Sequence, residues 1–179
     1  MYKRQVLSFF WSAKYHSVKA ERHILCCDNE ENEVVRFEGD NSNASVTRFD
    51  ELDRYITDFV VNLKNSGKRI YFVLDNPFAW ELDHHSMLKR TWNGFEMQEP
   101  KKLSKSLALS RSEPIRSRVI AIAKKTNSKI IDPFEYLCDE QYCSAFNKDG
   151  KPRYSDYNHF IRYTRSNEIH YLDFLFKNN

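Results

Sequence analysis

Residues 50–74, DELDRYITDFVVNLKNSGKRIYFVL, carry the pattern that decides the fold class. Apolar residues recur at helical spacing through residues 50–64 and form one broad stripe: Leu52, Tyr55, Ile56, Phe59, Val60 and Leu63. We expect Thr47 or Asp50 to cap this helix and the glycine of the following Asn-Ser-Gly turn to end it. The apolar run at residues 70–74 is then expected to be a buried strand. Helix followed directly by buried strand is half of a βαβ unit, which implies a parallel sheet and a right-handed crossover.

Further apolar runs continue this alternation of helix and strand. Residues 6–11 and residues 129–131 are expected to be strands, because each run is short and largely apolar. Residues 112–125 are expected to be a helix that Ser112 caps and that carries Pro114 in its first turn. The pattern predicts an α/β fold of three layers, in which helices cover a mostly parallel sheet.

Three other segments give weaker signals. Residues 21–37 favour a hairpin-like insertion. Residues 76–110 lose periodicity, which is uncommon over such a length unless the stretch is functional or holds short helices. Apolar residues after residue 158 indicate a closing helix, with Ser166 and Asn167 as a candidate break.

Length and composition suit one globular domain. The 179 residues are enough to bury a core, and 41% of them are hydrophobic. The net charge of +3 arises from 28 basic and 25 acidic residues that are intermixed, so we expect no nucleic-acid partner. The chain has only four glycines, which argues against glycine-rich phosphate loops. No apolar run reaches 18 residues and residues 1–11 do not resemble a signal peptide, so we expect no transmembrane segment in this sequence.

The adjacent histidines His84 and His85 raise the question of a metal site. We expect no metal there, because neighbouring histidines point in different directions and no carboxylate or cysteine lies at a metal-site spacing. Nothing else in the sequence indicates a cofactor.

A carboxylate and a histidine three residues apart form the strongest candidate for chemistry, Asp156-Tyr157-Asn158-His159. At this spacing the Asp156 carboxylate can accept a hydrogen bond from Nδ1 of His159, which leaves Nε2 free to take a proton from a nucleophile. A surface polar pair or a cap with no catalytic role fits the same four residues.

Two of the four cysteines, Cys138 and Cys143, are close enough in sequence to close a small disulfide loop. Spacing alone fits two free thiols nearly as well. The other two, Cys26 and Cys27, are adjacent and cannot readily pair with each other.

The order of features before His159 resembles that of a known family. A short strand at residues 129–131 is followed by Asp132-Pro133, Leu137-Cys138, Cys143, Asp149-Gly150 and the Asp156-to-His159 segment. This order resembles the C-terminal part of the SGNH (GDSL-like) esterase domain that is fused to membrane acyltransferases which O-acetylate bacterial surface polysaccharides. Residues 6–15 and 69–77 resemble two strand segments of the same family.

The resemblance implies a Ser-His-Asp mechanism for acyl transfer to polysaccharide or for ester hydrolysis. In that mechanism His159 deprotonates the serine and Asp156 orients the imidazole. The resemblance also implies a Cys138–Cys143 disulfide in an oxidising compartment, the periplasm or the extracytoplasmic face of the inner membrane. The implied partners are an acyl donor, a polysaccharide acceptor and an upstream membrane acyltransferase domain.

One departure from the family concerns the nucleophile. The family's serine lies in a Gly-Asp-Ser-His block before the strand that corresponds to residues 6–11, and this sequence contains no such block. Residues 38–42, EGDNS, imitate it but come after that strand, and we expect Gly39-Asp40-Asn41 to be a turn. We therefore expect residues 1–179 to be a single, N-terminally incomplete domain that lacks its first strand and holds only the Asp/His half of the triad. The alternative is a truncated or diverged non-catalytic module that binds glycan or a partner.

Overall fold

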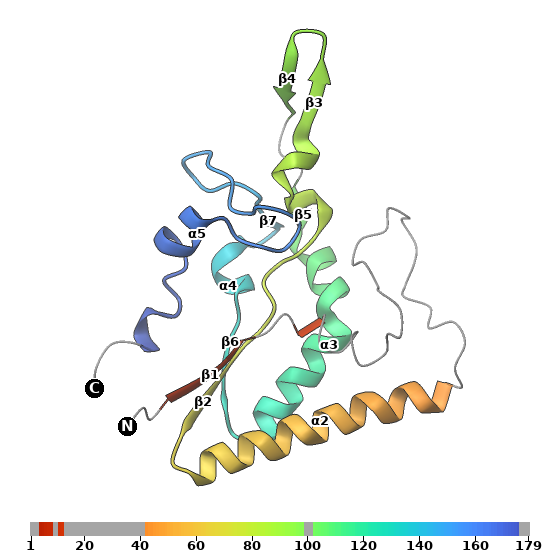
Figure 1. The fold of residues 1–179 in the computed structure, drawn as a ribbon, viewed down its shortest axis with the longest axis vertical. Helices are drawn as coiled ribbons and strands as arrows, with labels where there is room; N and C mark the ends of the chain where they lie inside the picture. The colour runs from red at the N-terminus through yellow and green to blue at the C-terminus, as the bar shows by residue number, and fades with distance from the viewer. Residues whose placement is uncertain (1–3, 9–10, 13–41, 99–101, 176–179) are drawn as a thin grey trace. The chain divides into compact units, whose positions relative to one another are not determined.

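The computed structural model describes residues 4–8, 11–12, 42–98 and 102–175 (Figure 1). The expected insertion at residues 21–37, the expected turn at residues 39–41 and the pair Cys26-Cys27 lie outside these residues. The chain divides into two compact units. The first comprises Met1–Leu74 and Pro114–Ile130, and the second comprises Asp75–Glu113 and Ile131–Asn179.

A three-stranded sheet in the order β1-β2-β6 organises the first unit. Strand β1 (Arg4–Ser8) runs parallel to β2 (Arg69–Val73), with Leu7 opposite Phe72, and β6 (Lys129–Ile131) lies on the other side of β2. Helices alternate with these strands along the chain, so the α/β class with a mostly parallel sheet is confirmed. All three strands lie where apolar runs predicted them, although β1 begins and ends earlier than residues 6–11.

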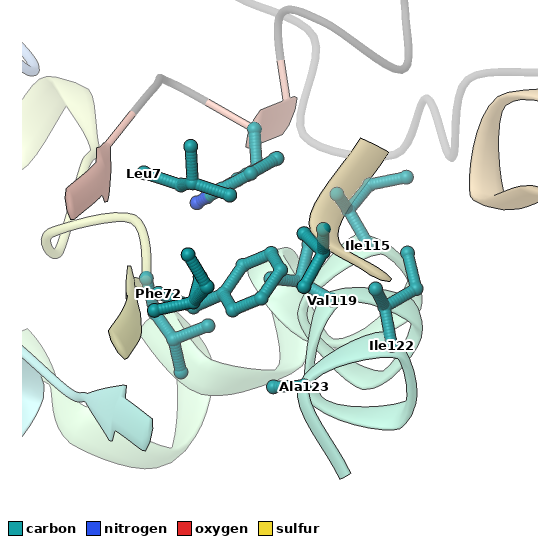
Figure 2. Packing of buried hydrophobic residues seen from close by; sticks show 10 residues of the cluster. Leu7, Phe72, Ile115, Val119, Ile122 and Ala123 are labelled. Carbon is teal, nitrogen blue, oxygen red and sulfur yellow. The ribbon is translucent and has the colours of Figure 1, made fainter. Parts of the chain in front are cut away.

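Alternate residues of β2 form the core of the first unit together with two helices (Figure 2). The cluster comprises Leu7, Trp11, Val60, Ile70, Phe72, Leu74, Ile115, Val119, Ile122 and Ala123. Phe72 at its centre is completely buried, and its ring lies 5.7 Å from that of Trp11. The indole Nε1 of Trp11 donates a 2.7 Å hydrogen bond to the carbonyl of Val73, which satisfies the one polar group that this side chain brings into the core.

The first of these helices, α2 (Ser42–Asn65), is longer than predicted. Thr47 and Asp50 lie inside it, so the prediction that either caps it is wrong; the Asp50 carboxylate instead pairs with Arg118 of the second helix at 3.0 Å. The apolar stripe is also narrower than predicted, because Tyr55 and Phe59 are 60% and 53% exposed. The start was missed because residues 42–48 are mostly small and polar, although Phe49 lies at helical spacing from Leu52 and packs against the same core.

The second helix, α3 (Lys105–Lys125), also begins earlier than predicted. Ser104 takes the capping role, since its Oγ accepts a hydrogen bond from the Leu107 N–H at 3.2 Å. Ser112 is not a cap; its hydroxyl donates to the carbonyl of Leu109 within the helix at 3.0 Å. Pro114 therefore lies in the middle of a helix rather than at its start, and the division between the two units falls there.

Apart from the first part of α3, up to Glu113, the second unit consists of short elements. They are η1 (Trp80–Leu82), η2 (His84–Met87), β3 (Leu88–Thr91), β4 (Gly94–Met97), β5 (Leu103–Ser104), α4 (Phe134–Leu137), β7 (Tyr142–Cys143), α5 (Arg162–Asn167) and η3 (Asp173–Leu175). β3 and β4 form an antiparallel hairpin, and β5 pairs antiparallel with β7. The buried residues of this unit form their own cluster: Ala79, Leu82, Met87, Leu103, Ala108, Phe134, Cys143, Ala145 and Tyr154.

Two predictions bear on this unit. Short helices do occur within residues 76–110, but the hairpin there was not predicted, although Asn93-Gly94 is a common turn signal. The closing helix is shorter than predicted: α5 ends at Asn167, the candidate break, and η3 follows separately. None of the helices in the described part of the chain is long and apolar enough to cross a membrane.

Candidate active site

The Asp156-to-His159 segment lies at the tip of a narrow closed loop. At the base of the loop, the N–H of Ile161 donates to the carbonyl of Arg153 at 3.0 Å, and Tyr154 and Phe160 form an antiparallel bridge. One step further on, the backbone N–H of Ser155 donates to the carbonyl of His159 at 2.7 Å. This ladder brings the two ends of the segment together and fixes its backbone.

Asp156 and His159 are directly hydrogen-bonded. The His159 Nδ1 lies 2.8 Å from Oδ2 of Asp156, while Oδ1 accepts the backbone N–H groups of Asn158 at 2.9 Å and of His159 at 2.8 Å. Because an ionised carboxylate only accepts, the hydrogen of a neutral His159 ring is on Nδ1 and Nε2 carries a lone pair. No described residue hydrogen-bonds that Nε2. The two side chains therefore have the arrangement that a general base needs.

The same contacts keep Asp156 ionised. Partial burial raises the pKa of its carboxyl, but the hydrogen bonds from the backbone N–H groups of Asn158 and His159 and from the His159 ring together lower the pKa below the ordinary value of an aspartate. The His159 side chain is 71% exposed, so its Nε2 side can be approached by a second reacting group.

Tyr154 anchors the loop in the core of the second unit. Its side chain is 1% exposed, and its ring lies 4.8 Å from that of Phe160. Burial raises the pKa of its hydroxyl, which is also hydrogen-bonded to the side chain of Asn76. The loop is thus held by a large buried side chain two residues before Asp156.

A mostly buried ion pair supports the base of the loop. The Nε of Arg153 donates to Glu168 Oε2 at 2.8 Å, and the two side chains are 16% and 17% exposed. The other oxygen of Glu168 accepts from Asn147 Nδ2 at 2.9 Å, and Arg153 also donates to the carbonyl of Leu137 at 3.3 Å. Because these groups satisfy one another, the pair holds the loop against α4 and the end of α5.

Cys138 and Cys143 form the disulfide that the family resemblance implied. The sulfur atoms are 2.03 Å apart, and the two residues also form an antiparallel bridge. Cys143 is 1% exposed and pairs with Leu103 of β5, so the disulfide joins the end of α4 to the β5–β7 ribbon.

The segment that follows β2 contains residues that the sequence did not reveal as part of the site. Nδ2 of Asn76 donates to the carbonyl of Asn158 at 3.0 Å, and the Ala79 N–H donates to the carbonyl of Tyr157 at 3.0 Å. A usable signal for Asn76 was its place directly after a buried parallel strand, where sites lie in open α/β sheets.

The structure differs at His84 and His85 from both reasons that were given for expecting no metal there. A carboxylate does lie beside them: Oδ1 of Asp83 accepts the backbone N–H of His85 at 2.9 Å and lies 3.0 Å from His85 Nδ1. The two rings lie against each other, with centroids 3.9 Å apart, instead of pointing apart. One ligand atom from each of the three residues lies within 4.8 Å of the others, so this trio could reach a common cation. The Nδ1 atom of each histidine is already hydrogen-bonded, which explains the arrangement without one.

Comparison with models of known protein families gives a match over most of the chain. The model of a family described as "SGNH domain (fused to AT3 domains)" matches residues 6–163, a range that includes parts of both units and the Asp156–His159 pair. No curated protein and no solved structure matches the chain.

Proposed function

The chain belongs to the family of SGNH domains that are fused to AT3 domains, and we propose that it supplies the Asp/His half of a Ser-His-Asp site for O-acyl transfer or ester hydrolysis. The family suggests acyl-transfer or esterase activity. The observation that carries the finer proposal is the 2.8 Å contact between Asp156 Oδ2 and His159 Nδ1, in a loop that leaves Nε2 unpaired among the described residues. These are the roles that the sequence predicted for the two residues.

The proposed reaction has two halves, and each half has two proton transfers at one atom. His159 Nε2 takes the proton of a serine hydroxyl as the serine oxygen attacks the acyl carbonyl, and the resulting imidazolium gives that proton to the leaving group. In the second half, Nε2 takes a proton from the acceptor hydroxyl, which attacks the acyl-serine, and returns it to the serine oxygen. Asp156 remains ionised throughout and stabilises the imidazolium, consistent with its lowered pKa.

The serine has to come from a Gly-Asp-Ser-His block, and residues 1–179 contain none. We therefore propose that the chain alone has negligible turnover. Removal of a triad nucleophile leaves only the residual rate that binding and oxyanion stabilisation provide.

For the acceptor we propose a hydroxyl of a cell-surface polysaccharide, with an AT3 domain as the source of the acyl group. For the compartment we propose the periplasm or the extracytoplasmic face of the inner membrane. The Cys138–Cys143 disulfide supports this location, because disulfides persist in oxidising compartments.

The alternative is a non-catalytic module that binds glycan or a partner. Two observations favour it. Oδ1 of Asp156 accepts two backbone N–H groups, so the aspartate has a structural reason to be present without any catalysis. The hairpin residues Trp92 and Phe95, 101% and 73% exposed, offer aromatic faces on which sugars stack.

Hydrolysis of an acyl ester such as p-nitrophenyl acetate separates the two functions. We expect no saturable hydrolysis by residues 1–179 alone. The chain joined to the Gly-Asp-Ser-His segment of a family member should gain turnover, which His159→Ala abolishes and His170→Ala leaves intact. His170 is a matched control, because it is also an exposed histidine paired with an aspartate three residues away, Asp173. Turnover of the joined chain that survives His159→Ala would contradict the proposal, and glycan binding without any turnover would favour the module.

A further inference from the structure

One segment of the second unit donates hydrogen bonds to three carbonyls of the loop that carries Asp156 and His159. Asn76 Nδ2 donates to Asn158 and the Ala79 N–H donates to Tyr157, as described above. His84 makes the third contact: its Nδ1 lies 2.8 Å from the carbonyl oxygen of Tyr154. The three acceptors fall on both sides of Asp156 in the sequence.

The His84 contact has a defined chemical form. A carbonyl oxygen only accepts, so Nδ1 of His84 must carry the hydrogen. A neutral ring in this tautomer and a protonated ring both donate at Nδ1, so the contact does not depend on the charge of His84.

The orientation of the His84 ring is fixed by its neighbours. Asp83 is 6% exposed and caps η2 by accepting the N–H of His85, which fixes the backbone where His84 begins the helix. The His84 ring packs on the His85 ring at 3.9 Å, and His85 is itself held by Asp83.

The hydrogen bond between His84 and the Tyr154 carbonyl holds the base of the loop that carries the candidate site. Tyr154 lies two residues before Asp156 and bridges to Phe160, the residue after His159. Fixing the Tyr154 carbonyl therefore fixes the start of the ladder that holds the Asp156–His159 pair. Displacements of about 1 Å in a reacting group are enough to lower rates about 100-fold.

We propose that His84 is a positioning residue, which holds the Asp156–His159 loop by donating its Nδ1–H to the carbonyl of Tyr154. The importance of this role for catalysis rests on the function proposed above, whereas the positioning itself does not.

Three substitutions test the role. His84→Asn keeps a donor close to the place of Nδ1, His84→Gln moves the donor further along the side chain, and His84→Ala removes it. The reporters are the backbone amides of Asn158 and His159, which donate to Asp156 within the loop. Native-state hydrogen exchange measures how often they open. We expect exchange about tenfold faster in His84→Gln and His84→Ala and close to wild type in His84→Asn, as loss of one hydrogen bond in a local opening predicts.

Global unfolding in urea, measured on the same variants, identifies any that simply fail to fold. If His84→Ala fails to fold, the comparison of hydrogen exchange between His84→Asn and His84→Gln still tests the proposal. Equal exchange in these two variants would overturn the proposal. His85→Ala is the neighbouring control: it removes the ring that packs on His84 but not the donor, so we expect a smaller change in exchange than in His84→Gln.

In a chain joined to the Gly-Asp-Ser-His segment, His84→Gln should lower kcat with little change in KM. In His84→Asn, kcat should stay close to that of the unsubstituted joined chain. Equal hydrogen exchange of the Asn158 and His159 amides in His84→Gln and His84→Asn would refute the positioning role. Turnover that survives His159→Ala would instead refute the proposed function, so the two failures are distinguishable.

Discussion

Opening the Cys138–Cys143 disulfide tests how much this crosslink stabilises the fold around the candidate site. The two cysteines are five residues apart in sequence, so the crosslink closes a very short loop. The loop-entropy relation gives about 2 kcal/mol of stabilisation for a loop of this size at 25 °C. The effect arises in the unfolded chain, which gains conformations once the crosslink is removed.

The folded loop has hydrogen bonds of its own that do not need the disulfide. Oδ1 of Asp139 accepts the N–H groups of Gln141 at 2.8 Å and of Tyr142 at 2.6 Å, and the Asp139 N–H donates to the carbonyl of Tyr142 at 2.9 Å. We therefore expect the reduced protein to keep the native loop. The decrease in its free energy of unfolding should then stay near the entropic value of about 2 kcal/mol.

The assay is urea unfolding followed by tryptophan fluorescence, with and without reductant, in a Cys26→Ser/Cys27→Ser background that removes the other two thiols. The Cys138→Ala/Cys143→Ala variant should have the same free energy of unfolding as the reduced protein. The slope of that free energy against urea concentration should be unchanged. A loss below about 0.5 kcal/mol would mean that the unfolded chain is already constrained there, and one above about 4 kcal/mol that the native loop needs the bond. Either result would refute the reasoning.

Two further predictions concern the site and the core. In Asp156→Asn the side-chain amide can donate to the His159 ring, so we expect the ring hydrogen to move from Nδ1 to Nε2. The ¹⁵N chemical shifts of the imidazole measure this change. A hydrogen that stays on Nδ1 would show that the carboxylate does not set the tautomer. Phe72→Ala should lower the free energy of unfolding by about 3–5 kcal/mol, because the ring is completely buried. Tyr55→Ala, at a position 60% exposed, should change it by about 0.5 kcal/mol or less, and equal losses from the two would contradict the packing described for α2.

The elements that were predicted well are those whose signal is local. Strand β2 is a run of buried apolar residues, and Val60 of α2 lies on the predicted stripe and is completely buried. The helix starts were missed because the rules used there concern single residues. Pro114 favours the first turn of a helix, but a proline also fits an interior position when the rest of the helix is stabilised by packing, and Val119 and Ala123 of α3 are completely buried.

One part of the candidate site was likewise predictable from the sequence, and another part was not. Asp156 and His159 are three residues apart, so their contact could be inferred from spacing. Their support comes from Asn76, Ala79 and His84, which are 70 to 82 residues away from their acceptors in the sequence. The acceptors are backbone carbonyls, which every residue has, and such a contact leaves no trace in the sequence of the loop.

Spacing alone does not make a candidate base, and the second Asp–His pair of this unit shows why. Nδ1 of His170 lies 3.0 Å from Oδ2 of Asp173, nearly the distance found at His159, and the spacing is again three residues. Its Nε2, however, lies 2.7 Å from the carbonyl of Asn167. A ring whose two nitrogens both face acceptors favours the protonated form: the Asp173 hydrogen bond and then the Asn167 carbonyl raise the pKa of His170. Nε2 of His170 thus faces a carbonyl oxygen, whereas His159 keeps its Nε2 unpaired among the described residues, and this difference is what singles out His159 as the candidate base.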